Sequence, residues 1–186
     1  MLATLRHFTF LGLFLAVFGM STGLHAQQDS SDTEAEVKEM AQKQFERMYE
    51  KVIENTSDRM VLTGGVKPFA VVTDTGDNVK VVRLKQAEEM PAELALEVVR
   101  RSLRVLVGKG KVGATTLVYV ADNPNQESEA DKVLVAEMEH IFGLTFAQLT
   151  PYTMKDGEPR FGEPVVVDME PSIFKTEEKS GEEADQ

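Results

Sequence analysis

The hydrophobic and polar positions of this chain follow two periods, and the clearest signal is a strand at Gly113–Ala121. The stretch is rich in β-branched and aromatic residues and is bounded by Gly113 and by the turn-forming residues 122–125. Apolar side chains occupy both of its alternating faces. This pattern predicts a central strand that is covered on both sides, around which the rest of the fold is arranged.

Two other stretches have the three- and four-residue spacing of apolar positions that is typical of helices. The first follows a capping-box sequence at 31–34 and is expected to end at about Asn55, where several polar residues follow one another. The second is expected over 91–107, with Pro91 in its first turn.

The remaining β-rich stretches predict hairpins. Residues 69–73 and 79–84 are joined by a five-residue loop that contains Asp and Gly. Residues 144–154 alternate in polarity and lead into a hairpin turn at 155–158. Residues 165–167 are expected to form the last strand.

Residues 132–142 fit either a strand or a helix. We prefer the strand, because 144–154 follows immediately and itself alternates. The chain is therefore predicted to be a single α+β domain, with an antiparallel sheet of five or six strands and two packed helices in the order α-β-β-α-β-β-β-β. This order resembles the roadblock, longin and profilin-like group, and also the cone-shaped NTF2-like folds. Both resemblances rest on element order alone and imply no function.

The beginning of the chain has the pattern of a secretory signal. An apolar run at 8–20 is followed by small residues up to Ala26, where cleavage is expected. An uncleaved membrane anchor is the alternative, but the run is shorter than the roughly 20 residues of a spanning helix. We therefore expect an exported protein, periplasmic or secreted, with no membrane span after cleavage. The expected divisions are a signal peptide at 1–26, a flexible leader at 27–33, an α+β domain at 34–170 and an acidic disordered tail at 171–186.

Composition excludes several classes of function. The chain has no cysteine, which rules out a disulfide scaffold and a thiol nucleophile. Its net charge of −11 makes it a poor candidate for binding nucleic acid.

Two sequence motifs also fail to match the sites that they resemble. The glycines at 108–113 match a dinucleotide-binding pattern, but they follow a helix and precede a strand, which is the reverse of the order in a dinucleotide site. The acidic loop at 122–131 lacks the glycine of a calcium loop. We expect no cofactor and no metal.

One region is locally basic although the whole chain is acidic. The functional interpretation is a patch for an acidic partner or an anionic ligand, and the alternative is ordinary helix electrostatics. The patch would also suit the chain's own acidic tail. Its expected members are Arg100, Arg101, Arg104, Lys109 and Lys111.

These observations favour an exported, non-enzymatic protein-interaction or adaptor module of the cell envelope, which would bind through its sheet face or an exposed strand edge. The alternative is a small-molecule binding domain with a pocket between helix 91–107 and the sheet. His140 is the only histidine after the expected cleavage point, and we expect a structural role or a position at a pocket rim rather than catalysis. An enzyme that uses carboxylates alone is a third hypothesis. The expected lining of the pocket is Leu134, Met138, His140, Phe146 and Tyr152.

Overall fold

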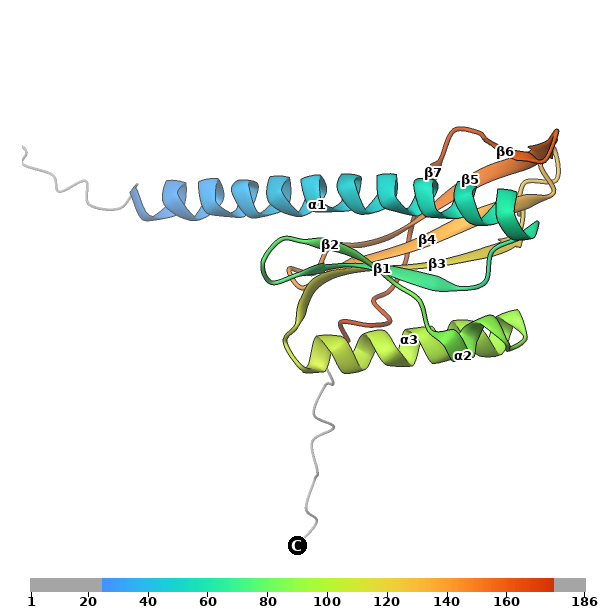
Figure 1. Cartoon of the computed structure of the whole chain (residues 1–186). Helices are drawn as coiled ribbons and strands as arrows, with labels where there is room; N and C mark the ends of the chain where they lie inside the picture. Colours follow the sequence, from blue (N-terminus) through green and yellow to red (C-terminus); the bar gives the residue numbers. More distant parts are fainter. Residues whose placement is uncertain (1–24, 176–186) are drawn as a thin grey trace, which may run out of the picture.

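The computed structural model describes residues 25–175, which form a mixed α+β domain around one antiparallel sheet (Figure 1). The helices are α1 (His25–Thr63), α2 (Lys85–Glu88) and α3 (Ala92–Gly108). The strands are β1 (Phe69–Asp74), β2 (Val79–Val82), β3 (Val112–Asp122), β4 (Lys132–His140), β5 (Thr145–Lys155), β6 (Glu158–Phe161) and β7 (Val165–Asp168). The α+β class with an antiparallel sheet is thus confirmed. The expected numbers of two helices and five or six strands were too low for residues 25–175, because the expected order omitted α2 and β6.

The sheet has the order β2-β1-β3-β4-β5-β6, and β7 pairs with β5 beside β6. β3 lies between β1 and β4, and helices cover both of its faces (Figure 1). Val118 packs in the core on the α1 side, whereas Leu117 packs in the core on the α3 side. The prediction of a central strand covered on both sides is therefore confirmed.

The expected end of the first helix was wrong. α1 continues past Asn55 to Thr63, with Thr56 and Met60 buried against the rest of the domain. Polar residues at this point signal a helix end only where no tertiary contact holds the next turn, and here packing overrides the local preference. At the other end the helix includes residues 27–33, which were expected to be a flexible leader.

The ambiguous segment is a strand, as preferred, and the helical alternative is wrong. β4 ends at His140, and Gly143, with φ at 84°, turns the chain back into β5. Phe142 therefore lies in the turn, 51% exposed, and not on the strand face of His140. The predicted turn after β5 is also present, with positive φ at Asp156 and Gly157, as a tight hairpin with two central residues requires.

The folded part extends further towards the C-terminus than expected. Ile173 is only 4% exposed and belongs to the core beneath α3. The tail predicted from residue 171 therefore begins inside the packed domain. The expected signal peptide at 1–26 lies almost wholly outside the described residues, as do residues 176–186 of the tail. None of the helices within residues 25–175 is long and apolar enough to span a membrane.

Candidate interaction site

β2 is an edge strand whose outer side is unpaired in the described part of the chain. The bond from Asp74 N–H to Asn78 O fixes which residues of β2 bond to β1, because an antiparallel ladder alternates at every second residue. Val79 and Val81 therefore turn their main-chain N–H and C=O groups away from β1. This edge offers donors and acceptors to an additional strand.

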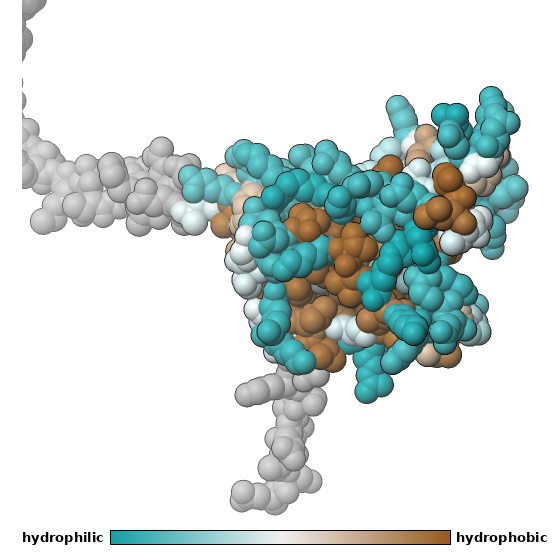
Figure 2. Space-filling model, in the orientation of Figure 1, coloured by the Kyte–Doolittle hydropathy of each residue, from teal (hydrophilic) through white to brown (hydrophobic). Residues whose placement is uncertain are grey.

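An apolar groove lies beside this edge, between β2 and α3. It has a volume of about 440 Å³, and Figure 2 shows hydrophobic side chains gathered on the face between α1 and α3. Val105 contributes a side chain that is 50% exposed. The residues that line the groove are Val82, Leu84, Arg101, Ser102, Val105 and Leu106.

The α3 side of the groove is basic. Arg101 and Val105 lie four residues apart on the exposed side of α3, and Lys109, the C-terminal cap of this helix, follows four residues later and bonds through its N–H to the Val105 carbonyl. Within residues 25–175 neither Arg101 nor Lys109 takes part in an ion pair. Two uncompensated positive charges therefore flank an apolar side chain at the rim.

Two arginines of the predicted patch are engaged elsewhere. Arg100 points towards the sheet, where its guanidinium bonds to Glu97 and to both carboxylate oxygens of Glu137 at 3.2 and 3.3 Å. Tyr119 donates its hydroxyl proton to Glu137 at 2.9 Å. Burial and the neighbouring Glu137 carboxylate raise the pKa of Tyr119, so the phenol stays protonated and keeps donating. Arg104 donates Nε–H to the carbonyl of Ser172 at 2.8 Å.

The predicted patch is thus divided. Arg101, Lys109 and Lys111 remain at the surface, while Arg100 stabilises the contact of α3 with the sheet. Arg104 bonds to the main chain of Ser172, in the segment that precedes the acidic tail. The alternative that the patch receives this tail stays a prediction, because residues 176–186 lie outside the described residues.

Glu139 is a binding residue that the sequence analysis missed. Its side chain is fully buried on the α3 side of β4, and its carboxylate accepts hydrogen bonds from three consecutive main-chain amides. Ser172 donates both N–H and Oγ–H at 2.8 Å, and the N–H groups of Ile173 and Phe174 donate at 2.9 and 3.0 Å. A carboxylate at an inward position of an apolar strand was the available signal, because buried charges need partners.

The five residues of the predicted pocket lie on the opposite face from the one expected. They are on the side of the sheet that packs against α1, whereas α3 covers the other face. Leu134 and Met138 are fully buried in the core around Phe45 and Met48. The prediction of a pocket with this lining between α3 and the sheet is therefore wrong, because these residues of β4 and β5 all lie on the face that packs against α1.

His140 is buried, and hydrogen bonds engage both of its ring nitrogens. Nδ1 accepts the Phe142 N–H at 3.1 Å, which leaves the proton on Nε2 to donate to Gln44 Oε1 at 3.0 Å. Gln44 in turn donates to Asp77 at 2.9 Å. Burial lowers the pKa of His140, so the ring is neutral and links β4, α1 and the β1–β2 turn.

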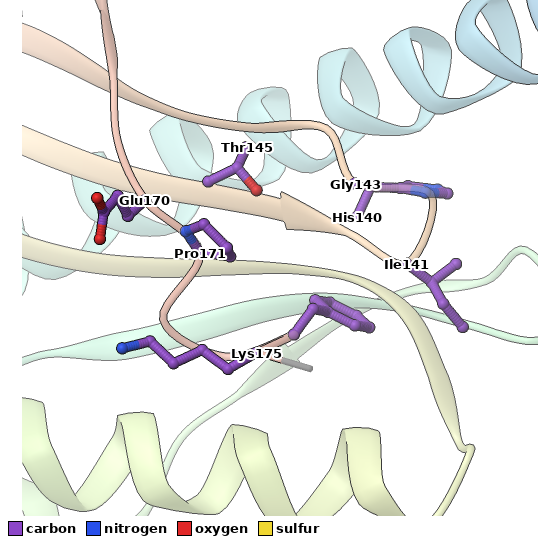
Figure 3. A pocket seen from close by; sticks show the side chains of 8 residues that line it. His140, Ile141, Gly143, Thr145, Glu170, Pro171 and Lys175 are labelled. Atoms are coloured by element: carbon purple, nitrogen blue, oxygen red, sulfur yellow. The ribbon is translucent and has the colours of Figure 1, made fainter. Parts of the chain in front are cut away.

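A second hollow, of about 650 Å³, lies between the β4–β5 turn and the C-terminal segment. Figure 3 shows Glu170 and Lys175 at one end of it and the His140 ring at the other. Its titratable groups do not converge on one point, as an acid–base site would require. Among the described residues there is also no cluster of three or more side chains that could hold a metal ion.

No protein family, curated protein or solved structure matches this chain. The resemblance in element order therefore remains a resemblance, and the interaction site is interpreted from its own geometry.

Proposed function

We propose that this domain is a protein-interaction module that binds an extended segment of a partner protein as an additional strand on β2. The observation that carries the proposal is the edge of β2, which no other strand of residues 25–175 pairs with, next to an apolar groove. Main-chain hydrogen bonds to Val79 and Val81 would supply affinity, and the groove would accept side chains from one face of the added strand.

The chemistry of the site indicates the kind of segment. Side chains of an extended strand alternate between its two faces, so apolar residues at every second position would meet Val82, Val105 and Leu106. Arg101 and Lys109 at the rim favour acidic residues in that segment. The favoured ligand is therefore an extended peptide with apolar and acidic residues.

No comparable observation favours the small-molecule hypothesis, because Leu134 and Met138 of its expected lining are packed in the core. Export to the cell envelope remains part of the proposal. It rests on the signal-like pattern at 1–26.

The test uses two fluorescein-labelled eight-residue peptides with Thr at every second position. Of the four other residues, which face the groove, the middle two are Val and the outer two are Glu in the Val/Glu peptide or Lys in the Val/Lys peptide. Fluorescence anisotropy is expected to show binding of the Val/Glu peptide only. Reversing both rim charges, with Arg101→Glu and Lys109→Glu, is expected to weaken that binding by about fivefold or more. Amide hydrogen exchange at Val79 and Val81 is expected to slow when the peptide is bound, which is the signature of strand addition.

Val81→Pro provides a sharper control. The Val81 N–H points away from β1, so proline removes a donor of the free edge and no bond of the hairpin. The variant is expected to keep its fold but no longer bind the Val/Glu peptide. Binding that is equal for both peptides, or that Val81→Pro does not change, would refute the proposal.

A further inference from the structure

The opposite end of the sheet carries a second free edge of different character. β7 pairs only with β5 in the described residues, and all four of its residues are exposed. Val165, Val166 and Val167 are 58%, 60% and 38% exposed. Three consecutive exposed valines on an unpaired edge favour association with another strand.

The register shows which main-chain groups are free. Gly162 N–H donates to Pro151 O, so Pro151 and every second residue before it in β5 bond towards β6 and β7. Val165 and Val167 are the β7 residues opposite those positions. The N–H and C=O groups of Val166 therefore point away from β5, towards the free edge.

We infer that β7 is a self-association edge, whose occupant is β7 of a second copy of this chain in antiparallel, twofold pairing. A twofold axis beside Val166 would make the two Val166 residues exchange both of their main-chain hydrogen bonds. Asp168 N–H would then meet the partner's Pro164 C=O. Proline has no N–H, so its carbonyl is the group it can offer, and Asp168 carries the matching donor.

Charge makes this edge the surface on which two copies would meet with the least repulsion. The chain has a net charge of −11, so two copies repel each other over most of their surfaces. Val165–Val167 is an uncharged strip, and the twofold pairing sets Asp168 opposite Pro164 rather than opposite another acid. At the β2 edge, by contrast, self-pairing would bring the basic rims of two copies together.

The dimer is expected to be weak. Two four-residue strands cover far less than the roughly 1,200 Å² of a stable interface, which indicates a dissociation constant on the order of 100 µM. Sedimentation velocity of residues 27–186 over a range of concentrations around this value is the first measurement, with a rising mean mass as the expected result.

Disulfide trapping tests the register. The chain has no cysteine, so a single introduced thiol reports on one position. Two opposed residues that exchange hydrogen bonds have Cα atoms about 5.5 Å apart, within disulfide range. Val166→Cys is expected to give a covalent dimer at least tenfold faster than Val165→Cys, whose nearest opposed residue is Val167 of the other copy.

Three variants separate this edge from other surfaces. Val166→Pro removes only an outward donor and is expected to abolish self-association without loss of fold, as judged by circular dichroism. Val61→Lys removes an equally exposed valine from α1 and is expected to leave the dimer unchanged. Val81→Pro, which tests the peptide site, is expected to dimerise normally. A protein that stays monomeric at 1 mM, a dimer that survives Val166→Pro, or equal trapping at positions 165 and 166 would overturn the inference.

Discussion

Glu139 offers the most direct test of how the C-terminal segment is held. Its buried carboxylate is the acceptor for the N–H groups of Ser172, Ile173 and Phe174. Glu139→Gln keeps the size of the side chain but replaces one acceptor oxygen by an NH₂ group. Whichever way the amide turns, at least one main-chain N–H faces another donor, and the remaining bonds lose their charge.

The magnitude follows from these contacts. A buried donor without a partner costs about 1–3 kcal/mol, and hydrogen bonds to a charged acceptor exceed neutral ones by roughly 1 kcal/mol each. We therefore expect Glu139→Gln to lower the free energy of unfolding by about 2–4 kcal/mol. The loss of unfolding free energy has an upper limit, because residues 172–174 can detach from the domain instead of staying in place without their acceptor. Detachment gives up the burial of Ile173, which contributes about 2 kcal/mol.

Urea denaturation at pH 7 measures this loss, and amide hydrogen exchange locates it. Exchange at Ile173 and Phe174 is expected to accelerate before the sheet opens. Glu170→Gln is the matched control, because this nearby glutamate is exposed. A Glu139→Gln protein within 0.5 kcal/mol of the parent, with the amides of 172–174 still protected, would refute the account.

Three further predictions concern single side chains. Arg100→Met should destabilise the fold by about 1–3 kcal/mol, because it leaves the partly buried Glu137 carboxylate without its cation. Arg101→Met should change stability by less than about 0.5 kcal/mol. Thermal unfolding of the two variants measures these losses, and equal losses would contradict the different roles of the two arginines. The lowered pKa of His140 means that the unfolded chain binds a proton more tightly than the folded one, so stability should be complete above about pH 6.5 and should fall as the pH drops below it. Urea titrations across pH 5–8 should show that the free energy of unfolding falls with decreasing pH in the parent and falls less steeply in His140→Gln. The same pH dependence in both proteins would contradict this role of His140. Thr116→Val should raise stability by about 1 kcal/mol, because the buried Thr116 hydroxyl has no hydrogen-bond partner among the described residues; a lower melting temperature would indicate a partner.

The sequence predicted the features that depend on local pattern. Apolar residues on both faces of 113–121 identified the central strand, and the alternation in 144–154 decided that 132–142 pairs as a strand. The length of α1 could not be read in the same way. Asn55 and the polar residues after it resemble a helix end, and only packing of Thr56 in the folded domain shows otherwise.

The site was harder to predict, because it depends on contacts between distant segments. Arg100 and Arg101 are neighbours in sequence, but they lie about 100° apart around the helix, and only the position of the sheet decides which one is buried. The predicted pocket residues, on β4 and β5, share one face of the sheet, but the helix that covers this face is α1 and not the predicted helix 91–107. The bonds from Glu139 to Ser172 cross more than thirty residues of chain and have no local pattern.

The hydrogen bonds between the Glu139 carboxylate and residues 172–174 also determine the order in which parts of the domain can fold during synthesis. During synthesis β4 emerges well before the amides that satisfy its carboxylate, so an incomplete chain would have to bury an unpartnered charge. The part of the core around Glu139 is therefore completed only after residues 172–174 have left the ribosome. A product truncated before Ser172 would leave the Glu139 carboxylate without its partners and would be less stable towards proteases, whereas the finished chain supplies them from its own C-terminal segment.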